Sequence, residues 1–246
     1  MRALPTFFAA SALALSGCGS GNDVNASANQ AVSQAPLPRL PAPNNGDWTQ
    51  VVSRTPEGGT RVGNPDAPVK LIEYGSLTCP ACQAFATTAT RPLLDTYVRS
   101  GQVSWEFRHL VIHGGPDVVM AMLSDCQPEA AFFSTIEQLY LQQREILAHL
   151  DQPTQTRLQA LPPEQQLGPL ARALQLDTFF ARRGMPEARF NQCLGNLPAA
   201  QRLADNLATA SREGVGGTPT FILNGERQEA SSWAAIEPLL RAAIGG

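Results

Sequence analysis

The pattern of apolar and polar positions predicts an alternation of short strands and helices. Four short runs are apolar and rich in β-branched or aromatic residues, which predicts strands at 48–54, 69–74, 103–110 and 220–223. Asn224-Gly225 is a strong signal for a two-residue hairpin turn, so a further short strand is expected near Arg227. The pattern therefore predicts a sheet of five strands.

Helical periodicity fills most of the remaining chain. Between residues 116 and 213 the chain is rich in alanine, leucine, glutamine and arginine, and it is interrupted at Pro153, Pro162, Pro163, Gly184 and Pro198. Thr78 can cap an earlier helix that starts at Cys79 or Pro80, and a last helix is expected at 232–244. The order of elements predicts an α/β domain with a helical insertion at about 116–196.

The first residues have the features of an export signal. Arg2 precedes an apolar run from 4 to 15, which is too short to span a bilayer, and Leu15-Ser16-Gly17-Cys18 looks like the lipobox of a bacterial lipoprotein. We expect residues 1–17 to be a signal peptide and Cys18 to be lipid-modified. An ordinary secretory signal, in which Cys18 is incidental, is the alternative, and in both cases the domain leaves the cytosol.

The stretch 18–45 differs in composition from the rest. It consists mainly of Asn, Ala, Ser, Gln and Pro, which cannot bury enough apolar surface to offset the entropy of ordering. We expect a disordered tether, followed by one domain at 46–246. No later apolar run has the ~20 residues needed to cross a membrane. Membrane attachment is therefore expected through acyl chains alone.

The charge of the chain excludes one class of partner. The formal net charge is −3 and the isoelectric point is about 5.6. A nucleic-acid-binding protein usually carries a basic patch, so nucleic acid is not an expected partner.

The five cysteines divide into Cys18 and four in the domain. An even number of cysteines in an exported domain implies pairing. Of the three possible connectivities, the short spacing favours Cys79 with Cys82, which leaves Cys126 and Cys193 as a structural disulfide. Two buried free thiols at these last two positions are the alternative.

Cys79-Pro80-Ala81-Cys82 follows a predicted strand and opens a predicted helix. A thiolate attacks disulfides, and the unpaired N–H groups and positive dipole of a helix N-terminus stabilise one there. Cys79 is therefore the predicted exposed nucleophile, and Cys82, three residues later, is the buried resolving thiol. The pair forms a redox-active disulfide, so no other cofactor is expected.

Three stretches together resemble the DsbA-like thiol–disulfide oxidoreductases of the thioredoxin superfamily. They are 73–82 with the cysteine motif, the helical stretch that contains Cys126, and 214–221 with Thr218-Pro219. The resemblance covers residues 46–246. It implies a thioredoxin-like fold, in which helices flank a central mixed sheet and a helical insertion is added, and a protein-disulfide oxidoreductase activity.

The resemblance also implies roles for residues near the cysteines. The Thr218-Pro219 bond is expected to be cis and to face the cysteines, where it offers backbone for pairing with a substrate peptide. Thr218 is expected to tune substrate affinity. Glu73 stands where relatives keep a buried acid, which would exchange a proton with Cys82 when a mixed disulfide resolves.

The two residues between the cysteines are expected to tune the redox properties. Pro80 is tolerated at the start of a helix. Ala81 stands where many relatives carry a histidine that further stabilises the thiolate. We therefore expect a lowered pKa for Cys79 and a milder oxidant than the strongly oxidising relatives.

Three functions fit these residues. The first is a lipid-anchored oxidase on the periplasmic side, which gives disulfides to unfolded or reduced exported proteins and is reoxidised by a membrane partner. The second is an isomerase or reductase; such relatives usually have an added dimerisation region, for which 19–45 is too short, so a monomer is expected. The third is a copper or zinc chaperone. Met120 and Met122 are its only nearby candidate ligands. His109 and His113 stand four residues apart but have no evident third ligand in the sequence, so no metal site is expected.

Overall fold

The computed structural model describes residues 36–43 and 46–245. Its strands are β1 (Val52–Arg54), β2 (Thr60–Val62), β3 (Val69–Gly75), β4 (Val103–His109), β5 (Thr220–Leu223) and β6 (Glu226–Gln228). Its α-helices are α1 (Pro80–Pro92), α2 (Gly115–Asp125), α3 (Phe132–Leu141), α4 (Gln143–Ala148), α5 (Gln152–Gln159), α6 (Leu167–Ala173), α7 (Leu176–Ala181), α8 (Glu187–Leu194), α9 (Leu197–Arg212) and α10 (Trp233–Gly245). The predicted signal peptide, Cys18 and most of the predicted tether lie outside the described residues.

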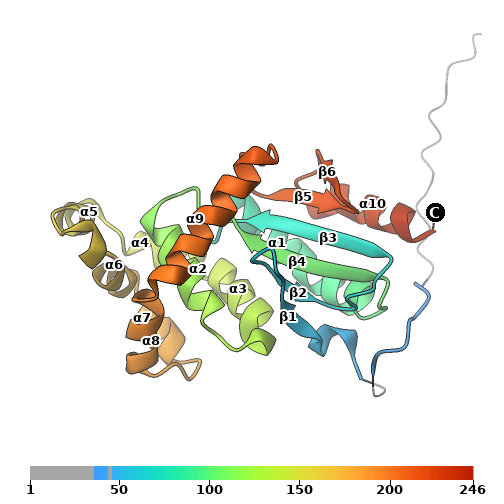
Figure 1. The fold of residues 1–246 in the computed structure, drawn as a ribbon, viewed down its shortest axis with the longest axis horizontal. Coiled ribbons are helices and arrows are strands. Elements are labelled where there is room, and N and C mark those ends of the chain that lie inside the picture. Colours follow the sequence, from blue (N-terminus) through green and yellow to red (C-terminus); the bar gives the residue numbers. More distant parts are fainter. Residues whose placement is uncertain (1–35, 44–45, 246) are drawn as a thin grey trace, which may run out of the picture. The chain divides into compact units, whose positions relative to one another are not determined.

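The six strands form one sheet in the order β1-β2-β4-β3-β5-β6 (Figure 1). β3 and β4 are parallel, with Val69 opposite Val103 and Gly75 opposite His109, and all other pairs are antiparallel. This mixed sheet with flanking helices confirms the predicted fold class. Because β3 is paired on both sides, the chain that leaves its carboxyl end starts from a fixed position.

The prediction of one strand at 48–54 is wrong. Trp48–Gln50 is a 3-10 turn, because the Asp47 carboxylate caps it by accepting the Thr49 N–H at 2.9 Å. Only Val52–Arg54 is extended. It pairs with β2, which the sequence pattern did not reveal because three residues are too few for a recognisable alternation.

Alternate residues of β3 point to opposite faces of the sheet. Leu71 belongs to the main core with α1 and α10, where the rings of Phe85 and Phe221 lie 4.5 Å apart. Tyr74 belongs to a second cluster, which Leu207 of α9 covers. Figure 1 accordingly shows α9 in front of the strands and α1 behind them.

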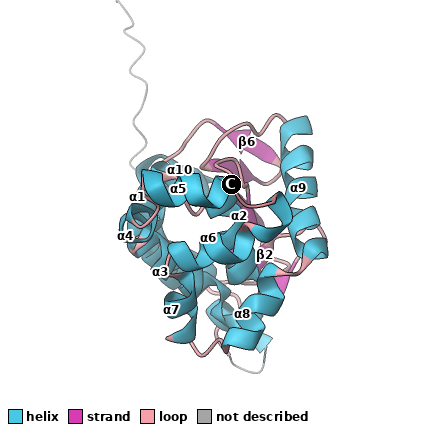
Figure 2. Cartoon of the chain, turned by 90° about the vertical axis from the view of Figure 1, so that its left-hand side faces the viewer, coloured by secondary structure: helices cyan, strands magenta, loops and turns pink. Residues whose placement is uncertain are grey.

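Helices α2–α8 form the predicted insertion between β4 and β5, and Figure 2 views the domain from their side. Cys126, at the end of α2, forms a disulfide with Cys193 of α8, with a Cα–Cα distance of 6.0 Å. The pairing is the one that the cysteine count predicts. It joins two helices that are 67 residues apart in sequence.

Two local features bear on other predictions. Asn224 and Gly225 have φ values of 50° and 87°, as the predicted hairpin turn requires. Residues 36–43 lie within the predicted tether, yet Leu37 packs against the main core and the Leu40 N–H donates to the Ser100 carbonyl at 2.7 Å. This part of the predicted tether therefore contacts the domain.

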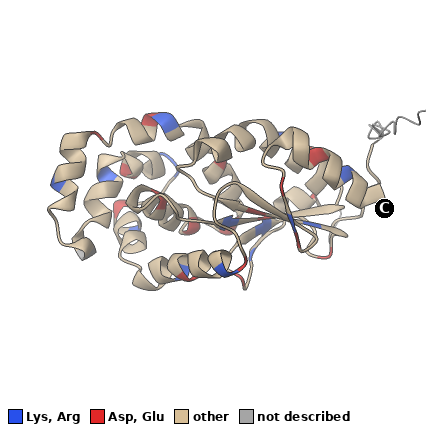
Figure 3. Ribbon diagram, turned by 90° about the horizontal axis from the view of Figure 1, so that it is seen from above, with Lys and Arg blue, Asp and Glu red and all other residues tan. Residues whose placement is uncertain are grey.

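Acidic and basic residues are interspersed along the chain (Figure 3). In the part of the chain that the structure describes, no helix combines the length and the apolar character needed to cross a bilayer.

We expect the Cys126–Cys193 disulfide to stabilise the insertion. Replacing both cysteines by alanine should lower the free energy of unfolding by about 2–4 kcal/mol, because the closed loop is long. Urea unfolding of the oxidised proteins measures this loss, and the reactivity of Cys79 serves as a control for an intact active site. An unchanged unfolding midpoint would show that the bridge adds no stability.

Candidate active site

The candidate active site lies where β3 passes into α1. The helix begins at Pro80, whose missing N–H costs no hydrogen bond at this position. Cys79 is the N-cap residue, so the predicted capping by Thr78 is wrong. The Thr78 hydroxyl is engaged elsewhere, at 3.1 Å from the Ser76 hydroxyl and 3.1 Å from Nδ1 of His113. Cys79 therefore stands directly at the helix N-terminus.

Both cysteines of the motif are reduced and buried. Cys79 exposes 7% of its surface and Cys82 none, so the prediction of an exposed nucleophile is wrong in degree, although Cys79 is the more accessible of the two. The Cys79 thiol donates to the carbonyl oxygen of Thr218 at 3.3 Å, and the Thr218-Pro219 bond is cis, as predicted. The loop before β5 thus lies against the sulfur of Cys79.

The surroundings separate the pKa values of the two thiols. A hydrogen bond from Cys82 lowers the pKa of Cys79 to about 5, against the opposing effect of burial. Further lowering comes from the side chain of Thr218, as distinct from its carbonyl, and from the backbone N–H groups of Cys82 and Ala81. The hydrogen bond to Cys79, burial and the charge of Glu73 all raise the pKa of Cys82. At neutral pH the site therefore holds one thiolate and one thiol, and the predicted lowering is confirmed.

Glu73 lies in β3 and exposes 1% of its surface. Burial raises its pKa to about 8, and a hydrogen bond from Nε1 of Trp105, at 3.2 Å, opposes the rise. The charge of Glu73 raises the pKa of Cys82, so the carboxyl and the thiol interact electrostatically. A carboxyl with this pKa can both release and accept a proton near neutral pH.

The helical insertion adds contacts that the sequence did not reveal. The Tyr140 hydroxyl donates to the carbonyl of Ser76 at 3.2 Å, and the Gln143 amide donates to the carbonyl of Leu77 at 2.8 Å. The carboxylate of Asp117 accepts the Leu77 N–H at 3.1 Å. All three side chains are buried. Their only sequence signal is a polar residue on the apolar face of a helix, which does not say what it contacts.

The two histidines after β4 have different partners. Nε2 of His109 lies 3.2 Å from the Ser124 hydroxyl and 3.5 Å from Asp125, whereas His113 contacts Thr78. Over residues 36–43 and 46–245, no three His, Cys, Asp or Glu side chains form a group that could hold a metal ion.

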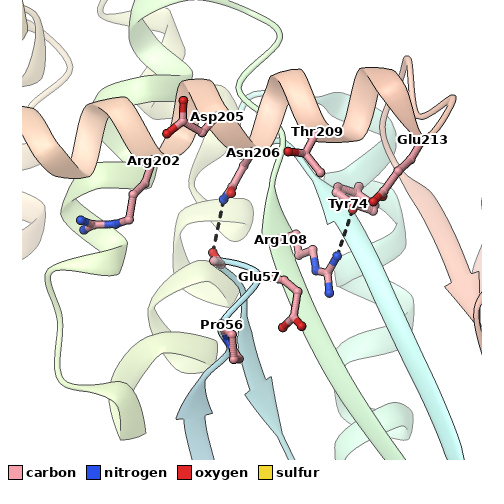
Figure 4. A pocket seen from close by; sticks show the side chains of 10 residues that line it. Pro56, Glu57, Tyr74, Arg108, Arg202, Asp205, Asn206, Thr209 and Glu213 are labelled. Atoms are coloured by element: carbon pink, nitrogen blue, oxygen red, sulfur yellow. Dashed lines mark hydrogen bonds between the residues drawn. The ribbon is translucent and has the colours of Figure 1, made fainter.

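A separate hollow of about 300 Å³ lies beneath α9 (Figure 4). At its edge Arg108 donates to the Tyr74 hydroxyl at 3.1 Å, and this hydroxyl donates to Glu213 at 3.1 Å. Arg202 and Asp205 of α9 also line it. The hydrogen bonds tie β3 and β4 to the end of α9, from which the chain leads to the Thr218-Pro219 loop.

Comparison with known protein families identifies the family of this chain. A family model described as Thioredoxin matches residues 55–242. The chain belongs to this thioredoxin family. The match includes the Cys79–Cys82 motif, the Cys126–Cys193 disulfide and the cis proline.

Solved structures of other proteins share this fold. The protein-disulfide isomerase from Novosphingobium aromaticivorans is 26% identical, with a TM-score of 0.71 over 76% of this chain and 97% of that one. The alpha-DsbA1 of Wolbachia pipientis is 19% identical, with a TM-score of 0.60 over 84% of this chain and 94% of that one. The predicted DsbA-like form of the thioredoxin fold is confirmed.

A further relative is much longer than this chain. The Na(+)/H(+) antiporter NhaA 1 of Salinispora arenicola is 30% identical over 172 residues, which are 69% of this chain and 22% of the antiporter. The chain thus spans about a fifth of this relative.

We expect Glu73 to make the stability of the oxidised protein depend on pH. Because its pKa of about 8 in the folded state lies above the ordinary value of about 4.3, the folded state binds an extra proton between these values. The free energy of unfolding should therefore fall as the pH rises from 5 to 8. In Glu73→Gln this fall should be smaller.

Urea unfolding of the oxidised protein at several pH values measures the effect, since the Cys79–Cys82 disulfide does not titrate. Glu226→Gln, at an exposed position of β6, is the matched control. If Glu73→Gln kept the pH dependence of the wild-type protein, Glu73 would not be the buried proton-binding group.

Proposed function

We propose that this protein is an extracytoplasmic thiol–disulfide oxidoreductase that works as a dithiol oxidase. The observation that carries the proposal is the lowered pKa of Cys79, about 5. A stable thiolate favours the reduced form of the pair, so the Cys79–Cys82 disulfide is easily given up to a substrate.

The reaction begins when a substrate thiolate attacks the sulfur of Cys79 in the oxidised enzyme. The Cys79–Cys82 bond breaks, a mixed disulfide forms, and Cys82 leaves with the electron pair and takes a proton from Glu73. A second substrate thiolate then attacks the substrate sulfur of the mixed disulfide and releases the Cys79 thiolate. The substrate has lost two electrons, which the Cys79 and Cys82 pair now holds.

The surroundings of Cys79 suit an unfolded polypeptide as substrate. Thr218 and Pro219 lie beside the sulfur, where backbone can pair with an extended chain. Ile112 and Leu141 expose 37% and 55% of their surfaces, and each is next in sequence to a residue that contacts segment 76–79. Two singly exposed side chains do not make an apolar patch, so the proposed substrate contact rests on the backbone of Thr218.

The proposal includes the location and partners of the protein. Residues 1–17 act as a signal peptide, and Cys18 carries lipid that anchors the domain on the periplasmic side of a bacterial membrane. Residues 18–45 act as the tether, and the domain at 46–246 works as a monomer. A membrane redox partner reoxidises the Cys79–Cys82 pair.

An isomerase or reductase is the second candidate. It is favoured by the 26% identity to a protein named protein-disulfide isomerase. Ala81 points the same way, because a side chain without a donor adds no further stabilisation to the thiolate.

We expect the reduction potential of the Cys79–Cys82 pair to lie above about −230 mV, since its thiolate is stabilised. Equilibration with glutathione buffers measures it. The protein should also oxidise a reduced, unfolded substrate, and Cys79→Ala should abolish this activity while Cys126→Ala/Cys193→Ala retains it. A potential near that of thioredoxin, about −270 mV, would contradict the oxidase. Rescue of a scrambled substrate without net oxidation would favour the isomerase.

A further inference from the structure

Of the contacts between the insertion and segment 76–79, those of Gln143 reach the reactive cysteine. Gln143 is the first residue of α4 and exposes 1% of its surface. Its Nε2 donates to the carbonyl oxygen of Leu77 at 2.8 Å and to that of Cys79 at 3.1 Å. A primary amide has two N–H donors. Both donors of this side chain therefore act on the segment that carries the reactive sulfur.

The carbonyl of Cys79 is shared between two elements. It accepts the Gln83 N–H at 3.1 Å, which is the first hydrogen bond of α1, as well as the amide of Gln143. Gln143 lies 64 residues later in the chain. A donor from the insertion thus fixes the peptide unit between the N-cap cysteine and the helix.

We propose that Gln143 is a positioning residue for thiol–disulfide exchange: it fixes the peptide groups of Leu77 and Cys79 and offsets the negative ends of their carbonyl dipoles, which stabilises the Cys79 thiolate. The inference rests on the proposed thiol–disulfide chemistry but not on its direction. A carbonyl oxygen that keeps its partial charge opposes a thiolate on the same residue, and a donor on that oxygen reduces the opposition.

Gln143 differs in kind from the other polar groups around Cys79. The titratable side chains that face the site are, by element, Glu73 in β3, Cys82 in α1, His113 in the loop before α2, Asp117 in α2 and Tyr140 in α3. Gln143 adds two donors without a charge, so its contribution is the same across the pH range in which these groups titrate.

Gln143→Met tests the inference, because it removes both donors and keeps an unbranched side chain of similar length. Gln142→Met is the matched control: Gln142 is the neighbouring glutamine, and its backbone bonds to Gln138 and Ile146 do not involve the substituted side chain. Thiolate absorbance at 240 nm, followed against pH in the reduced proteins, gives the Cys79 midpoint. Equilibration with glutathione gives the equilibrium constant for reduction of the Cys79–Cys82 disulfide.

In Gln143→Met we expect the midpoint of the Cys79 thiolate absorbance to rise by about one pH unit. The equilibrium of the Cys79–Cys82 pair with glutathione should shift about tenfold toward the disulfide. Gln142→Met should keep both wild-type values. A folded Gln143→Met protein with wild-type values would overturn the inference.

The wild-type protein provides a second measurement that depends on no variant. In the ¹⁵N-labelled reduced protein, the side-chain amide signal of Gln143 should shift with pH at the midpoint of the thiolate absorbance. A constant signal while the thiolate titrates would overturn the inference. A wild-type thiolate midpoint near the ordinary cysteine value would instead contradict the proposed function, whatever Gln143 does.

Discussion

A negative charge on the sulfur of Cys79, the N-cap residue of α1, is the constraint on which the site depends. Its largest support is the thiol of Cys82, which stays protonated because its hydrogen bond to Cys79, burial and the charge of Glu73 raise its pKa. Burial also raises the pKa of Glu73, and the hydrogen bond from Nε1 of Trp105 opposes that rise. The asymmetry between two chemically identical side chains is therefore a product of their positions in the fold.

The fold secures these positions from three sides. β3 is paired on both edges and ends next to the motif. The loop before β5 brings the carbonyl of Thr218 to the sulfur. The helical insertion holds the connecting segment through Gln143 and Tyr140. The insertion thus contacts the segment that carries Cys79 directly.

Much of the arrangement follows from local sequence. β-Branched runs, the Asn224-Gly225 turn and the cysteine spacing predicted the central strands, the hairpin and the position of the motif, because each depends on neighbouring residues. The caps did not follow in this way. Thr78 was expected to cap α1, but the side chains of Ser76 and His113 hold its hydroxyl, and His113 lies 35 residues later in the chain. The exposure of Cys79 and the contacts of Gln143 likewise depend on elements far apart in sequence, which periodicity cannot locate.

The charge on Cys79 can be measured directly. In the reduced wild-type protein, the absorbance at 240 nm should rise with a midpoint at about pH 5, and the transition should be absent in Cys79→Ser. A midpoint near pH 8.5, which is about the ordinary pKa of a cysteine, would contradict the account, because the site would then hold two thiols at neutral pH.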